Sequence, residues 1–166
     1  MSGEKAGGEP RIIGFLCEWA SDGPDVVTRD MSLTGFPNVK VIRMPCSGMV
    51  KPAWLQAAIQ GDAKKGIEPA DGVLTLGCPM GDCHFNEGNF LCVERIARLS
   101  TRLRNRKINP ERIGQFYYGA TEGAAFLADV RKFVAKIKNL PEPAPAPEKA
   151  AKPAAKPATA EGSAGQ

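Results

Sequence analysis

Four apolar runs of strand length alternate with segments of helical period along this chain, and this alternation limits the folds open to it. The runs cover residues 11–17, 39–44, 72–76 and 112–118. The third run is apolar on both faces, which is typical of a parallel strand covered by helices on either side. The pattern predicts a three-layer α/β domain with a mostly parallel, four-stranded sheet.

The intervening segments carry helix signals. Asp22 and Pro24 form a plausible cap and first turn for a short helix within residues 21–33. A second helix is expected from Pro52 to Gly66, and longer ones over residues 86–106 and 122–140. Parallel connections are nearly always right-handed, so few topologies remain, and we expect the flavodoxin-like strand order 2-1-3-4.

Cysteines stand where three of the apolar runs end. They are Cys17, Cys46 and Cys78, and Cys83 follows the last of these closely. The carboxyl ends of parallel strands share one edge, and neighbouring strands lie about 4.8 Å apart, so the order 2-1-3-4 brings these thiols together. Four thiolates at an edge that also receives helix N-termini predict a metal site, in the first instance an iron-sulfur cluster.

A single buried cysteine is more often a small apolar filler than a ligand. Cys92 fits that description, because it lies on one helical stripe with Ile96, Leu99 and Leu103. Packing gives no reason, however, for four other thiols to occupy the junctions between strands and loops. We therefore assign Cys92 to the core and the other four to the site.

Composition sets the boundaries of the domain. The chain has 166 residues and five cysteines. Residues 1–10 are polar and glycine-rich, without the apolar segment of a signal peptide, and residues 141–166 contain too little apolar side chain to order. We expect a flexible N-terminus, one domain over residues 11–140 and a disordered C-terminal tail. An odd cysteine count without a secretion signal, and no apolar run near 20 residues, favour a cytoplasmic protein without a membrane span.

The net charge of +4 is modest, and much of it gathers on the expected helix over residues 86–106. No aromatic residues are interleaved with these cations, and no recognition motif accompanies them, which argues against a nucleic-acid partner. A solvated helix face is the favoured interpretation, with an acidic protein partner as the alternative. The cations are Arg95, Arg98, Arg102, Arg104, Arg106 and Lys107.

Other chemistries remain open from the residues alone. Cys78 or Cys83 near a helix N-terminus would suit a thiol redox protein, and four thiolates would also suit a structural zinc ion. A flavin at the switch point is less favoured, because the first turn, CEWASDGPD, lacks a phosphate-binding loop. Aromatic residues near the strand ends are interpreted as core, as a shield for the metal site or as a partner surface. They are Trp19, Phe85 and Phe90.

Five segments of the chain resemble one known family. They read IIGFLCEW, VIRMPCSGMV, ADGVLTLGC, GDCHFNEGN and ATEG. Their order and spacing are similar to those of the delta (iron-sulfur) subunit of methyl-viologen-reducing hydrogenases and its relatives in heterodisulfide-reductase-type electron-transfer complexes. The resemblance covers nearly the whole expected domain.

The resemblance implies a 2Fe-2S cluster, and the family cysteines map onto Cys17, Cys46, Cys78 and Cys83. It also implies that the chain relays electrons between a hydrogenase or formate dehydrogenase module and a flavin-containing, heterodisulfide-reductase-like subunit. Such a protein is an electron-transfer component of an oxidoreductase complex rather than a catalytic subunit by itself.

This chain departs from the family pattern at one position. The family usually has a Cys-x-x-Cys pair at the end of the first strand, and here the second member is Ala20. Four cysteines remain, which is the number that a two-iron cluster needs. If the missing cysteine is a ligand in relatives, this chain needs Asp82 or His84 as a substitute, or it holds a labile cluster or none. Otherwise His84 is expected to hydrogen-bond to the start of the following helix or to a cluster sulfur.

Overall fold

The computed structural model describes residues 8–21, 23, 25–61 and 66–141. Most of the expected flexible N-terminus, residues 1–7, and nearly all of the expected tail, residues 142–166, lie outside the described residues. The disorder predicted for them therefore stays a prediction.

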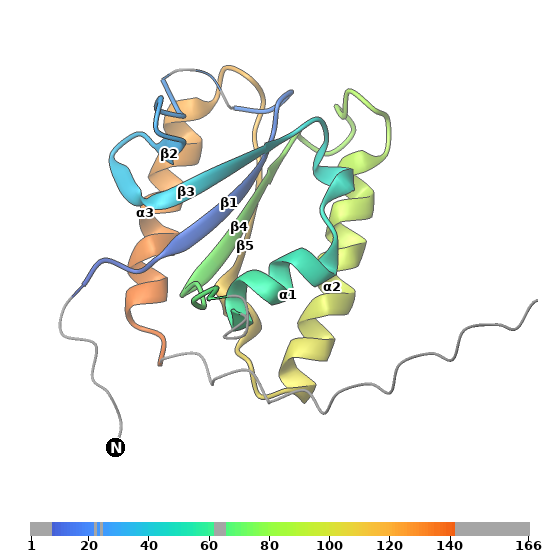
Figure 1. The fold of residues 1–166 in the computed structure, drawn as a ribbon. Coiled ribbons are helices and arrows are strands. Elements are labelled where there is room, and N and C mark those ends of the chain that lie inside the picture. The colour runs from blue at the N-terminus through green and yellow to red at the C-terminus, as the bar shows by residue number, and fades with distance from the viewer. Residues whose placement is uncertain (1–7, 22, 24, 62–65, 142–166) are drawn as a thin grey trace, which may run out of the picture.

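A five-stranded sheet forms the centre of the molecule (Figure 1). Its order is β2-β3-β1-β4-β5, with β3, β1, β4 and β5 parallel and β2 antiparallel to β3. The four parallel strands follow the expected order 2-1-3-4, but the predicted count of four strands is wrong, because β2 adds a short edge strand. The strands are β1 (Ile12–Cys17), β2 (Ser32–Leu33), β3 (Phe36–Met44), β4 (Gly72–Gly77) and β5 (Ile113–Tyr117).

The expected helix within residues 21–33 is not present in the described part of that stretch. Its proposed cap residues, Asp22 and Pro24, lie outside the described residues. The remainder forms turns and β2, with Met31 in a left-handed conformation at φ 57°. The Thr28 hydroxyl donates a hydrogen bond to the Ser32 carbonyl and accepts one from the Ser32 backbone N–H. Such local side-chain bonds favour turns over helix.

Three α-helices cover the two faces of the sheet. They are α1 (Pro52–Gln60), α2 (Gly88–Asn105) and α3 (Gly123–Lys138), with 3-10 turns η1 (Ser47–Met49) and η3 (Pro110–Arg112). The α1 helix ends before the predicted Gly66, because Gly61 follows it with a φ of 66° that breaks the helical geometry. Residues 62–65 are outside the description.

Two hydrophobic clusters lie on opposite faces of the sheet, which confirms the three layers. One cluster packs α3 against β1, β3 and β4, and the other packs α1 and α2 against the second face (Figure 1). The second contains the predicted stripe of Cys92, Ile96, Leu99 and Leu103, all at most 1% exposed. The assignment of Cys92 to the core is confirmed.

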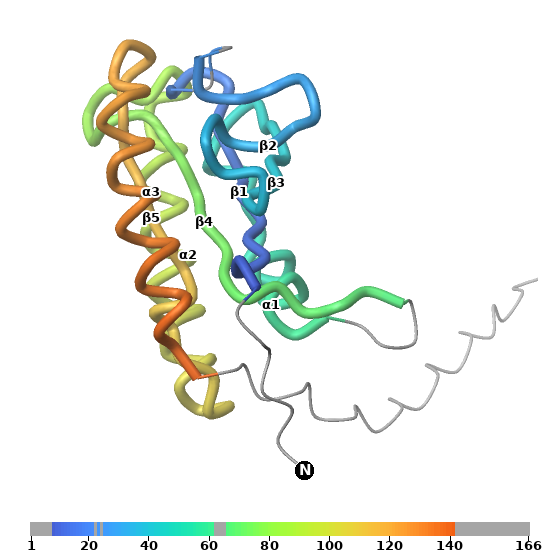
Figure 2. Tube along the Cα trace, turned by 90° about the vertical axis from the view of Figure 1, so that its left-hand side faces the viewer, coloured from blue at the N-terminus to red at the C-terminus, as the bar shows by residue number. Residues whose placement is uncertain are grey.

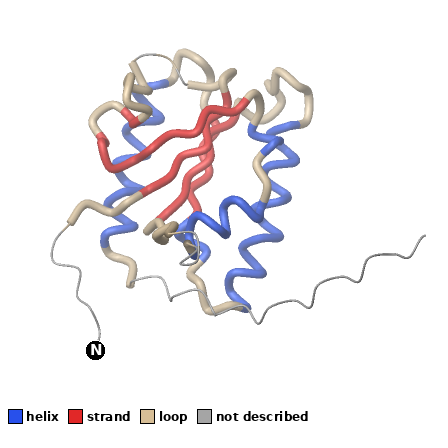
Figure 3. Tube along the Cα trace, viewed as in Figure 1, coloured by secondary structure: helices blue, strands red, loops and turns tan. Residues whose placement is uncertain are grey.

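Loops, not helices, follow the carboxyl ends of the parallel strands. Figure 3 shows them gathered at the top of the view, and Figure 2, turned by 90°, shows the same loops at one end of the molecule. This edge is where the sequence places its cysteines.

In the described part of the chain, no helix combines the length and the apolar character needed to traverse a bilayer.

Candidate metal centre

The strand pairing brings three of the predicted ligands to the carboxyl edge of the sheet. Cys17 is the last residue of β1 and lies beside Met44, the last residue of β3. Cys46 follows Met44 by two positions, and Cys78 comes directly after β4. The thiols of Cys17, Cys46 and Cys78 are all buried. The prediction that adjacent strands carry them to one edge is confirmed.

The four thiols form two adjoining pairs. The thiols of Cys17 and Cys78 interact with each other, and so do those of Cys46 and Cys83. A further electrostatic interaction joins Cys46 to Cys78 and so connects the pairs. Within the described residues, no three His, Cys, Asp or Glu side chains stand close enough to hold one metal ion. The geometry is that of two pairs rather than one tetrahedron, and the ligand set itself stays a prediction.

Close backbone contact at two glycines allows Cys46 and Cys83 to meet. A Cβ on Gly48 would stand 2.8 Å from the Cα of Gly88, so η1 and the first turn of α2 touch through these glycines. A Cβ on Gly88 would stand 2.2 Å from the Cys46 Sγ and 3.3 Å from the Cys83 Sγ. Any side chain at Gly88 would therefore occupy the space of the thiols.

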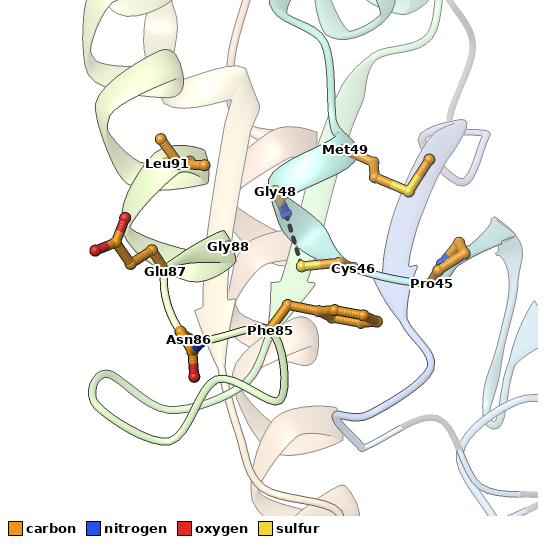
Figure 4. A pocket seen from close by; sticks show the side chains of 9 residues that line it. All are labelled: Pro45, Cys46, Gly48, Met49, Phe85, Asn86, Glu87, Gly88 and Leu91. Atoms are coloured by element: carbon orange, nitrogen blue, oxygen red, sulfur yellow. Dashed lines mark hydrogen bonds between the residues drawn. The ribbon is translucent and has the colours of Figure 1, made fainter.

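Cys46 caps the turn that follows it. Its Sγ accepts a hydrogen bond of 3.3 Å from the backbone N–H of Gly48 (Figure 4). Burial nevertheless raises the pKa of the Cys46 thiol. Burial likewise raises the pKa of Cys17 to about 11, although the backbone N–H groups of Trp19 and Ser47 act in the opposite direction.

Cys83 differs from the other thiols in its electrostatics. Burial would raise its pKa, but the backbone N–H groups of Asn89, Phe85 and Gly88 outweigh that effect and lower the pKa. Two of these donors belong to the first turn of α2, where the helix dipole also favours negative charge. The site therefore contains donors that stabilise an anionic sulfur ligand, as was expected from the topology.

One buried hydroxyl in the site has no partner among the described residues. Ser47 is 2% exposed and its Oγ makes no hydrogen bond to any residue that the structure describes. This oxygen lies 2.8 Å from the position that a Cβ on Gly77 would take, directly before Cys78. Buried hydroxyls are normally hydrogen-bonded, so an unsatisfied one beside the thiols fits the presence of a further acceptor. Thiol pairs, N–H donors and this hydroxyl together fit an iron-sulfur group.

The aromatic residues near the strand ends are exposed. Trp19, Phe85 and Phe90 have exposed fractions of 50%, 51% and 49%, so their interpretation as core is wrong. The ring of Trp19 stacks on His84, with centroids 3.4 Å apart and planes inclined by 6°.

The residues weighed as substitute ligands lie differently. Asp82 and His84 are both exposed, and Ala20, where the family has a cysteine, is 3% exposed and packs in the hydrophobic cluster under α3. Ala20 therefore contributes a methyl group to the core at this position.

A hollow of about 550 Å³ opens beside Cys46. Met49, Phe85 and Leu91 supply exposed apolar side chains to its wall, and Glu87 stands at its edge (Figure 4). The Cys46 thiol thus lies at the wall of a hollow that opens to solvent.

Three of these features have no direct signal in the sequence. For the contact between Gly48 and Gly88, the sequence offers only the two glycines themselves. Glycines are equally expected in turns, so they do not predict this contact. The unsatisfied hydroxyl of Ser47 and the stack between Trp19 and His84 depend on segments that are distant along the chain.

The amino-acid sequence is similar to those of known proteins. Residues 12–141 match the model of the family described as methyl-viologen-reducing hydrogenase, delta subunit. The iron-sulfur D subunit of the F420-non-reducing hydrogenase of Archaeoglobus profundus is 33% identical over 132 residues, which is 80% of this chain and 91% of that protein. The iron-sulfur D subunit of the F420-non-reducing hydrogenase vhc of Methanococcus voltae is 32% identical over 130 residues, covering 78% and 85% of the two chains.

A third relative contains the same stretch within a longer chain. The A subunit of the ferredoxin/F420H2-dependent CoB-CoM heterodisulfide reductase of Methanosarcina acetivorans is 33% identical over 132 residues, which is 79% of this chain but 16% of that protein. The family match extends from the first strand to just beyond α3 and includes all four cysteines of the carboxyl edge. This chain therefore belongs to the methyl-viologen-reducing hydrogenase delta-subunit family.

Proposed function

We propose that this protein is an electron-transfer subunit that carries a 2Fe-2S cluster on Cys17, Cys46, Cys78 and Cys83. It relays electrons between a hydrogenase or formate dehydrogenase module and a flavin-containing, heterodisulfide-reductase-like subunit. The proposal rests on one observation: two pairs of thiols adjoin at the carboxyl edge of the sheet. The chain also belongs to a family in which relatives are named iron-sulfur subunits.

The pairing of the thiols supports the two-iron type. A two-iron cluster needs two protein ligands on each iron, and the chain offers Cys17 with Cys78 and Cys46 with Cys83. A structural zinc ion instead requires all four thiolates around one centre. Two linked pairs suit the first arrangement better than the second.

The surroundings of the pairs support an anionic cofactor that transfers single electrons. Backbone N–H groups of Gly48, Gly88 and Asn89 point at the sulfurs of Cys46 and Cys83, and they stabilise negative charge there. Burial of the other two thiols keeps water from their side of the site. The chain's part is to hold the cluster and set its potential through these contacts.

The position of the site supports a relay. Cys83 is partly exposed, and the hollow beside Cys46 reaches the surface, so a partner's redox centre can approach closely. The relatives named as hydrogenase subunits support one proposed partner. The relative named as a heterodisulfide reductase component, which includes a similar stretch, supports the other. The role is that of a carrier within a complex rather than of a catalyst by itself.

Anaerobic purification of the full chain tests the cofactor. We expect about two irons and two acid-labile sulfides per chain, with visible absorption that bleaches on reduction. Serine in place of any one of the four cysteines abolishes or strongly perturbs this signal, whereas Cys92→Ser, on the buried face of α2, leaves it intact. Stoichiometric zinc without iron would reject the proposal.

The lowered pKa of Cys83 favours one second candidate, a thiol redox protein. Its thiol adjoins that of Cys46, since a Cβ on Gly88 would meet both sulfurs, so these two would form the reversible disulfide. Thiol titration after iron-free purification distinguishes the two functions. A Cys46–Cys83 disulfide that cycles under mild reduction, in a chain that takes up no iron, would favour this candidate.

A further inference from the structure

Two exposed rings connect loops from distant parts of the chain. Trp19 lies two positions after Cys17, in the loop that follows β1, and His84 lies directly after Cys83, in the loop that leads to α2. Their rings stack with centroids 3.4 Å apart and planes 6° from parallel. Phe85 adds an edge contact to His84 at 5.0 Å and 85°.

This stack bridges the two thiol pairs. Trp19 belongs with the first pair, because it follows Cys17 and its carbonyl oxygen accepts a hydrogen bond of 3.7 Å from the Cys78 thiol. His84 belongs with the second pair, because it directly follows Cys83 in the chain. The ring contact therefore ties the loop of one pair to the loop of the other.

Core packing does not account for the stack. Trp19 is 50% exposed and His84 is exposed, whereas Cys17 and Cys78 are buried. A large aromatic side chain that stays half in water contributes little to the core, yet its stacking on a second ring still restrains both loops. The contact stands on the solvent side of the thiols.

We propose that Trp19 and His84 form a clamp that sets the separation of the two cysteine pairs and retards loss of the metal group they hold. They are positioning residues and not ligands. The inference rests on the proposed function for the identity of that group. The clamp acts through the loops: when either ring is removed, both loops are released and the pairs separate.

The rate of iron release from the full, anaerobically purified chain tests the clamp. With a ferrous chelator in excess and loss of visible absorbance as the readout, we expect Trp19→Ala and His84→Ala each to release iron about fivefold faster or more. Because both remove the same contact, the double variant releases iron no faster than the quicker single variant. Trp19→Phe, which keeps a stacking ring, stays close to the unchanged chain.

Trp54→Ala is the matched control. This tryptophan is 40% exposed and stacks on Phe15, so its loss removes an exposed aromatic residue without touching the loops that hold Trp19 and His84. Its release rate should not change. Multiplicative rates in the double variant, or unchanged rates in both single variants, would overturn the clamp.

A second measurement separates the clamp from the proposed function. In the metal-free chain, alkylation of Cys83 by iodoacetamide, followed by mass spectrometry, should accelerate in Trp19→Ala and not in Trp54→Ala. If the unchanged chain never binds iron, the proposed function fails while this result still decides whether the rings restrain the loop. Equal alkylation rates in the two variants would reject the clamp even if iron is bound.

Discussion

The two edges of the parallel sheet differ in how their polar groups are satisfied. At the amino edge, the backbone N–H of Arg11 donates to the Asp71 carboxylate at 2.7 Å, and the Asp71 N–H donates to the Arg11 carbonyl at 2.8 Å. The guanidinium of Arg112, which is 2% exposed, donates to the carbonyls of Asp71 and Pro141. The chain itself closes this edge.

The carboxyl edge has the opposite character. Its thiols interact with one another and hydrogen-bond to backbone groups, and the buried Ser47 hydroxyl has no partner among the described residues. Exposed Trp19 and Phe85 border it. Buried polar groups are normally satisfied. The difference therefore teaches that the chain's own side chains bind the strand ends at the amino edge, whereas the carboxyl edge keeps an unsatisfied hydroxyl among its thiols and is arranged for a further group.

Gly88→Ala should produce the largest effect, and it acts at the carboxyl edge alone. The new Cβ would stand 2.2 Å from the Cys46 Sγ, so the thiol must move and the Cys46–Cys83 pair opens. We expect most of the bound iron to be lost, measured as iron per chain after anaerobic purification. Glu87→Ala, the exposed neighbour, is the control and should keep full iron. Full iron in Gly88→Ala would break the comparison, since the edge would then not depend on this contact.

Arg112→Ala tests the other edge. It leaves two carbonyl groups without a charged donor, so we expect the free energy of unfolding to fall by about 2–3 kcal/mol in urea titrations. The visible spectrum expected of the proposed cluster should stay unchanged, because the residue lies at the opposite end of the strands. Arg98→Ala is the control, since this arginine is exposed and its ion pair within the described residues is with Glu94 at 3.1 Å. A lost spectrum in Arg112→Ala would show that the two edges are not independent.

Periodicity and cysteine placement predicted the order of the parallel strands and the edge at which the cysteines gather, but not the contacts of the amino edge. Local patterns specify the parallel strands and long helices, and the handedness of crossovers then fixes their order. The position of β1 between β3 and β4 therefore followed, and with it the placement of Cys17, Cys46 and Cys78 at one edge.

Other parts depend on contacts that local patterns do not contain. Asp22 and Pro24 suggested a short helix within residues 21–33. Turn bonds around Thr28 and the pairing of Val27 with Leu33 instead place the described part of this stretch in turns and at the sheet edge. The approach of η1 to α2 joins segments far apart in the chain, as does the stack on Trp19. Such close contacts arise only once the loops are folded over one edge.

Ser47→Ala tests whether the carboxyl edge is incomplete without the proposed iron-sulfur group. In the chain stripped of iron by a chelator, an unsatisfied buried hydroxyl lowers stability, so its removal should raise the free energy of unfolding by about 1 kcal/mol. Urea titration measures this change. Ser100→Ala is the control, because that hydroxyl donates to the Ile96 carbonyl at 2.9 Å and its loss should not stabilise. Destabilisation by Ser47→Ala would mean that the chain alone satisfies this hydroxyl.

The smallest expected effect is a pH dependence at the amino edge. Glu111, next to Arg112, has a lowered pKa because it accepts hydrogen bonds from Lys136 and Asn109. A carboxyl group whose pKa is lower in the folded than in the unfolded chain stabilises the fold above its ordinary pKa of 4.5, and this contribution is lost as the pH falls through the folded value. The group is exposed, so the melting temperature of the unchanged chain should exceed that of Glu111→Gln by only about a degree at neutral pH. The difference should vanish in acid, while the iron content of the two chains stays equal at neutral pH. A difference that persists in acid would trace the effect to packing rather than charge, and the amino edge would then owe its closure to contacts other than this ion pair.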